Sequence, residues 1–104
     1  DLIVSRAGAT AIFEIAAWGK PSILIPIKNS AQDHQRKNAY SYAGRGAAVV
    51  IEEDNLTPSV LFNEIQKLIA EPERRKKLGD AAKNLAVLDA AETLAKEILN
   101  LGLH

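Results

Sequence analysis

The sequence of 104 residues contains no cysteine. This absence excludes disulfide bonds, zinc sites built on thiolates and cysteine nucleophiles, and it agrees with a reducing compartment. The chain also has no excess of charge of either sign, because 13 Lys and Arg residues balance 13 Asp and Glu residues. No overall field therefore draws it to nucleic acid or anionic lipid, and any anion must be bound by local geometry.

Long apolar runs are lacking too, and none approaches the length of a membrane span. We therefore expect a soluble, cytoplasmic protein. Methionine is absent, and Asp1 leads directly into a strand-like run, so we expect a fragment of something larger. A chain of this length holds one domain or part of one, and its hydrophobic fraction of 47% allows a small core.

Short apolar runs alternate with helix-like segments in the first half of the chain. Pro21 and Pro26 flank the second run, which is apolar throughout, as expected of a strand that is covered on both faces. The alternation predicts an α/β fold, a Rossmann-like parallel sheet with flanking helices and right-handed crossovers. The expected strands are 2–4, 22–26 and 47–51, and the expected helices are 10–18, which ends at Gly19, and 32–43, which ends at Gly44 or Gly46.

The second half is predicted to be helical. Thr57 is placed to cap a helix that has Pro58 in its first position, and Pro72 interrupts that helix. We expect a charged helix over 73–85 and a separate last helix over 89–101. The residues expected to face the core are Leu61, Ile65, Leu68 and Ile69 in the first of these helices and Leu94, Ile98 and Leu101 in the last. The basic run 74–77 is a solvated face or a contact for anionic lipid.

The first candidate site is a turn of small residues between the first apolar run and the first helix. Gly8 and Ala9 allow close backbone approach, and the N–H groups of Thr10 and Ala11 open the helix, where the dipole favours an anion. Glu14 lies four residues after Thr10, about one turn or 5.4 Å deeper on the same face, where a carboxylate suits a ribose diol. This predicts a nucleotide-diphosphate site. The alternative is a tight turn followed by a Glu on a solvated face.

The second candidate site is the start of the helix that follows the second strand. His34, Gln35 and Asn38 are spaced so that they can share one face, and carboxamides suit the hydroxyls of a sugar. The alternative is a polar, solvent-facing first turn in which Asp33 complements the helix dipole. His34 as a general base is the less favoured interpretation, and His104 is treated as incidental.

No other group of residues predicts catalysis. The sequence shows no Ser-His-Asp order, no pair of carboxylates in a cleft and no spacing of metal ligands. Glu52, Glu53 and Asp54 are interpreted as loop charges, and Phe13 and Trp18 as packing in the core or between domains. We assign no catalytic residue to this chain.

The blocks of sequence to be compared with known families are Ser5-Arg6-Ala7-Gly8-Ala9, Glu14, Gly19-Lys20-Pro21-Ser22-Ile23-Leu24-Ile25-Pro26, His34-Gln35, Asn38-Ala39, Gly46-Ala47-Ala48 and Leu56-Thr57. Together they closely resemble the MurG family, the UDP-N-acetylglucosamine:lipid I N-acetylglucosaminyltransferases of peptidoglycan synthesis. The resemblance covers essentially the whole chain. In place of His34 the family often has a second glutamine next to Gln35.

The resemblance implies a GT-B fold of two Rossmann-like domains, of which residues 1–104 are part of the C-terminal, donor-binding domain. It implies that Glu14 binds the ribose of UDP-N-acetylglucosamine (UDP-GlcNAc). It also implies that the backbone of Ala9, Thr10 and Ala11 meets the diphosphate. Gln35, with His34 and Asn38, would read the hydroxyls of the sugar.

By the same resemblance the reaction inverts the anomeric centre and uses no metal or other cofactor. Lipid I would be bound by a missing N-terminal domain, which also carries the base and contacts the inner face of the bacterial membrane, so the fragment alone is expected to be inactive. Two other interpretations remain open. One is another GT-B enzyme, either a different UDP-sugar transferase or a UDP-GlcNAc epimerase, and the other is a non-catalytic donor-binding subunit paired with a membrane partner.

Overall fold

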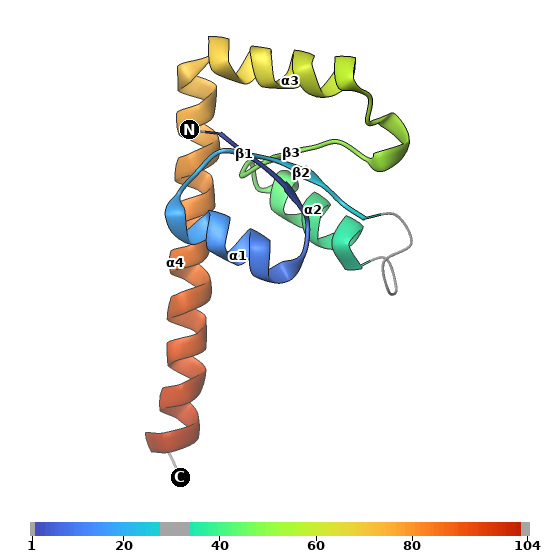
Figure 1. Ribbon diagram of the computed structural model, residues 1–104. Coiled ribbons are helices and arrows are strands. Elements are labelled where there is room, and N and C mark those ends of the chain that lie inside the picture. The colour runs from blue at the N-terminus through green and yellow to red at the C-terminus, as the bar shows by residue number, and fades with distance from the viewer. Residues whose placement is uncertain (1, 28–33, 103–104) are drawn as a thin grey trace.

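A computed structural model describes residues 2–27 and 34–102 of the chain (Figure 1). Three parallel strands form one sheet in the order β1-β2-β3. The predicted α/β fold with a parallel sheet and flanking helices is therefore confirmed. The elements are β1 (Ile3–Arg6), α1 (Ala9–Trp18), β2 (Ser22–Ile25), α2 (His34–Gly44), β3 (Val49–Val50), the 3-10 turn η2 (Glu53–Asn55), α3 (Pro58–Ala70) and α4 (Pro72–Gly102).

The central strand β2 is buried along its whole length, as its run of apolar residues predicts. It pairs with β1 in the register Ile3 to Ser22 and with β3 in the register Ile23 to Val49. The outer strand β1 alternates between half-buried and exposed side chains, since one of its faces is less well covered. The third predicted strand is shorter than expected, because only Val49–Val50 pair in the ladder.

Helices cover both faces of the sheet. In Figure 1, α3 lies across one face, α1 and α2 lie on the other, and α4 runs past one end of the sheet. Helix α4 contributes Leu78 to the core on the α3 side and Ala82 to the core on the α1 and α2 side. This helix therefore joins the two halves of the core.

Helix α1 ends where the sequence predicts, at Gly19. This glycine has a left-handed backbone (φ 65°), and its N–H closes the helix on the carbonyl oxygen of Ala16 at 3.0 Å. Helix α4 passes so close to this turn that a Cβ added at Gly79 would stand 2.5 Å from the carbonyl oxygen of Gly19. A side chain at position 79 would therefore push the two segments apart.

The two ends of α3 are closed in different ways. Its start has the predicted cap, because the side-chain oxygen of Thr57 accepts a hydrogen bond from the N–H of Val60 at 3.1 Å. At its end, the guanidinium of Arg75 donates to the carbonyl oxygens of Leu68 and Ile69. Arg75, from the run expected to face water, thus closes the corner between α3 and α4.

The prediction of two closing helices is wrong, because α4 is continuous over 31 residues. The expected break fell between Leu85 and Asp89, where the sequence reads Ala86, Val87, Leu88. None of these is a glycine or a proline, so nothing there stops the backbone hydrogen bonds of the helix. Within the described chain, no helix combines the length and the apolar character needed to cross a bilayer.

Several residues expected to be buried are exposed. Ile69 is turned to solvent with 61% of its surface accessible, and Leu94 and Ile98 are exposed on α4, whose last turns extend beyond α1 in Figure 1. Phe13 and Trp18 on α1 are exposed too, so they do not pack in the core of the described chain, and packing between domains stays a prediction. The side chain of Leu101 lies outside the described residues.

Candidate functional site

The carboxyl ends of the three parallel strands meet at one edge of the sheet. β1 ends at Arg6, β2 at Ile25 and β3 at Val50, and helices α1 and α2 begin beside this edge. In open α/β sheets this is the edge at which ligands bind. Both predicted binding segments therefore lie at the appropriate edge.

The start of α1 is open. Its N-cap, Gly8, is extended (φ −68°, ψ 149°) and offers no side-chain cap, and the first bond of the helix runs from the N–H of Ile12 to the oxygen of Gly8 at 3.0 Å. An α-helix offers no partner of its own to its first N–H groups, which here are those of Ala9, Thr10 and Ala11. A Cβ added at Gly8 would meet nothing within 4 Å. We call these three N–H groups the α1 mouth; they suit an anion.

Glu14 lies one turn deeper on α1. Its side chain and that of Thr10 are both exposed, as expected for residues four apart on one helical face. Across residues 2–27 and 34–102, no side chain or backbone group bonds to the Glu14 carboxylate. An acceptor of this kind can take both hydroxyls of a diol, which requires its two oxygens.

The second candidate site divides into three environments. Gln35 turns toward the sheet, and its Oε1 accepts a hydrogen bond from the N–H of Ile27, just after β2, at 2.9 Å. His34 is exposed, and Asn38 is half-buried. Asp33, expected to complement the helix dipole, lies outside the described residues.

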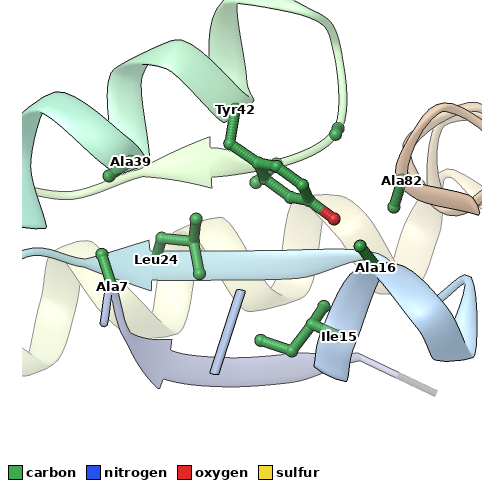
Figure 2. Packing of buried hydrophobic residues seen from close by; sticks show 9 residues of the cluster. Ala7, Ile15, Ala16, Leu24, Ala39, Tyr42 and Ala82 are labelled. Atoms are coloured by element: carbon green, nitrogen blue, oxygen red, sulfur yellow. The ribbon is translucent and has the colours of Figure 1, made fainter. Parts of the chain in front are cut away.

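Asn38 lines a hollow of about 330 Å³ between α1, α2 and α4. Tyr42, one turn further along α2, also lines it, and only 7% of its surface is exposed. Figure 2 shows the Tyr42 hydroxyl pointing between Ala16 and Ala82. No described group bonds to this hydroxyl, and burial raises the pKa of Tyr42 to about 12.

Glu52 and Glu53 lie in the loop between β3 and α3, as predicted, and both carboxylates form ion pairs at the same edge. Glu53 Oε1 lies 2.6 Å from the Arg6 guanidinium at the end of β1. Glu52 Oε1 lies 2.6 Å from Nε of Arg36, and its Oε2 accepts from the Tyr40 hydroxyl at 2.9 Å. The hydrogen bonds from Arg36 and Tyr40 hold the pKa of Glu52 below its ordinary value, and the bond to Glu52 raises the pKa of Tyr40.

A signal for these pairs exists in the sequence. Arg36 and Tyr40 are four apart, so they share a face of α2, and the two glutamates directly follow a strand whose carboxyl end lies at the ligand edge. As for metals, across the described ranges no three His, Asp or Glu side chains come together where they could hold an ion.

Comparison with known proteins shows which family the chain resembles. The model of the glycosyltransferase family 28 C-terminal domain matches residues 1–94. The UDP-N-acetylglucosamine--N-acetylmuramyl-(pentapeptide) pyrophosphoryl-undecaprenol N-acetylglucosamine transferase of Geobacter metallireducens is 50% identical over 99 residues, which are 95% of this chain and 27% of that protein. The transferase of the same name from Anaeromyxobacter sp. strain K is 46% identical over 101 residues, 97% of this chain and 26% of that protein.

A solved structure agrees as well. The crystal structure of Acinetobacter baumannii MurG matches with a TM-score of 0.71 and 27% sequence identity, over 91% of this chain and 28% of that chain. The resemblance inferred from the motifs is thus confirmed at the levels of sequence and fold. The chain spans 27% of the length of the Geobacter relative. Since the family model covers nearly the whole chain, the protein belongs to the family of glycosyltransferase family 28 C-terminal domains.

Proposed function

We propose that, in the complete protein, this chain is the donor-binding part of a transferase that moves GlcNAc from UDP-GlcNAc to lipid I, making lipid II for peptidoglycan. The names of the relatives support the reaction class. The observation that carries the site is the uncapped α1 mouth with the unpartnered Glu14 carboxylate one turn deeper on an exposed face.

In this proposal the α1 mouth binds the diphosphate of the donor. The 4-hydroxyl oxygen of the acceptor's muramyl sugar attacks C1 of GlcNAc and forms the new glycosidic bond. The bond from C1 to the β-phosphate oxygen breaks, and UDP leaves with the electron pair. The hydroxyl proton passes to a base that we assign to the N-terminal domain of the complete protein. Negative charge grows on the diphosphate during this step, and the N–H groups of Ala9, Thr10 and Ala11 stabilise it there.

Two helices bind the two ends of the donor. Glu14 on α1 accepts hydrogen bonds from the ribose hydroxyls, and Gln35 on α2, with Asn38 and His34 nearby, faces the sugar. The helix dipole and N–H groups of α1 supply the charge compensation that a metal ion supplies elsewhere, so we propose a reaction without metal or other cofactor.

The acceptor side of the proposal lies outside this chain. We propose that lipid I is bound by the N-terminal domain of the complete protein, at the inner face of the bacterial membrane, with which the enzyme associates peripherally.

The test is to replace Glu14 by alanine in the complete protein and to measure steady-state kinetics with UDP-GlcNAc and a lipid I analogue. Loss of charged hydrogen bonds costs about 1.5–3 kcal/mol, so donor kcat/KM should fall about 10- to 150-fold. The acceptor KM should stay within about twofold of the wild-type value, since the substitution removes uniform binding to the donor alone.

A matched control is Glu73→Ala, which removes an exposed carboxylate from the first turn of α4. It should leave donor kinetics unchanged. If Glu14→Ala behaves like Glu73→Ala, the ribose role is refuted. If the wild-type complete protein transfers no GlcNAc from UDP-GlcNAc, the whole proposal fails.

A further inference from the structure

Two adjacent carboxylates after β3 reach different elements. Glu53 pairs with Arg6 at the end of β1, whereas Glu52 pairs with two side chains of α2. These two neighbouring residues lie at the edge of the sheet where the strands end. One of them fixes the end of β1 before α1, and the other fixes α2.

The contact of Glu52 with α2 uses both carboxylate oxygens. Oε1 takes the Nε donor of Arg36 at 2.6 Å and Oε2 takes the Tyr40 hydroxyl at 2.9 Å. Arg36 also lies over the Tyr40 ring, with 5.6 Å between the guanidinium carbon and the ring centroid. The three groups thus hold each other in one arrangement, which fixes the rotation of α2 about its axis better than one ion pair would.

The start of α2 is held by polar contacts. The buried residues of this helix are Ala39, at its middle, and Tyr42, in its last turn. Near its start, a hydrogen bond from the Ile27 N–H to Gln35 holds the helix to the end of β2. Polar contacts to the ends of β2 and β3 therefore set where the first turns of α2 lie.

We propose that Glu52 is a positioning residue for donor selection: by holding Arg36 and Tyr40, it places Gln35 and Asn38 of α2 at the correct distance from the α1 mouth. This rests on the proposed function, in which α2 meets the sugar and α1 the diphosphate. Misplacement by about 1 Å can cost a hundredfold in rate. Loss of the tie should therefore affect the choice of sugar more than the binding of the nucleotide.

The experiment uses the complete protein and compares kcat/KM for UDP-GlcNAc with kcat/KM for its 4-epimer, UDP-GalNAc. Glu52→Ala should lower the ratio of the two kcat/KM values, and so the preference for UDP-GlcNAc, by about tenfold or more. This is within the loss of rate of about a hundredfold that a misplacement of about 1 Å can cause. Inhibition by UDP alone should change less than about twofold, because the α1 mouth is untouched. Arg36→Ala should move the preference in the same direction, and Glu52→Gln, which keeps one acceptor oxygen, should restore part of it.

The matched control is Glu53→Ala, which breaks an ion pair of the same 2.6 Å length one residue away but leaves α2 tied. It should not alter the sugar preference. A Glu52→Ala protein that keeps the wild-type preference overturns the inference, as does one that loses activity equally with both sugars. If Glu52→Ala does not fold, Tyr40→Phe and Arg36→Ala decide in the same way.

Failure of the inference and failure of the proposed function are distinguishable. If the proposed function is wrong, the wild-type protein itself shows no transfer from UDP-GlcNAc, and the inference falls with it. If only the inference is wrong, the wild type prefers UDP-GlcNAc and Gln35→Ala reduces this preference, while Glu52→Ala leaves it unchanged.

Discussion

The substitution Tyr42→Phe should stabilise the protein, and more so at high pH. The Tyr42 hydroxyl is buried and has no partner among the described residues. Leaving such a group unbonded costs about 1–3 kcal/mol, while phenylalanine keeps the ring that fills the space between Ala16 and Ala82. We expect a gain of about 1 kcal/mol at neutral pH, since removal of the oxygen also removes some packing.

The pH dependence follows from the pKa of this tyrosine. Burial raises it from 10.0 to about 12 in the folded protein. Between these values the unfolded chain loses the proton and the folded protein keeps it, so the free energy of unfolding falls as pH rises above 10. At pH 11 the loss from this residue is about 1.4 kcal/mol. Tyr42→Phe removes that loss, so its advantage should grow to about 2–2.5 kcal/mol.

The assay is urea unfolding of the complete protein at pH 7 and pH 11, with wild type and variant compared at each pH. Tyr40→Phe is the matched control, because that hydroxyl is exposed and bonded to Glu52, so its removal should not stabilise the protein at pH 7. Equal midpoints for wild type and Tyr42→Phe at both pH values would refute the reasoning, since they would mean that the hydroxyl is paired and titrates normally.

Two further predictions concern the scaffold. Gly79→Ala should destabilise the protein by about 1–3 kcal/mol, because the new Cβ would collide with the Gly19 carbonyl. Gly44→Ala should not destabilise it, because a Cβ at that position would meet nothing within 4 Å. Thermal unfolding of both variants checks this prediction. Thr57→Ala should cost about 1 kcal/mol through loss of the cap to Val60, and Thr57→Ser should restore most of it in the same assay.

Local signals predicted most of the fold. The Gly19 terminator, the Thr57 cap and the apolar run of β2 all lie where the sequence places them, because each depends on a residue's own backbone preference or on a covered strand. The closing helices were predicted less well. Apolar residues such as Leu94 and Ile98 repeat at helical spacing whether or not anything covers them, so periodicity alone does not say what they contact.

The sequence predicted which helix starts form the site, but it did not predict the contacts between side chains there. The open start of α1 and the exposed Glu14 follow from helix geometry, which spacing captures. The ion pairs of Glu52 and Glu53 depend on which strand lies beside which helix, since Arg6 is 47 residues from its partner. Separation in sequence hides such contacts until the order of the strands is known.

Two helices in this chain begin in opposite ways, α3 with a capped first turn and α1 with an open one. The open start leaves unmet hydrogen-bonding capacity in the unliganded protein. An anion that binds there supplies what a capping side chain supplies elsewhere, and any ligand that binds only the folded form raises stability in proportion to the logarithm of its concentration. If the complete protein binds UDP at the α1 mouth, as proposed, its melting temperature should rise with the concentration of UDP.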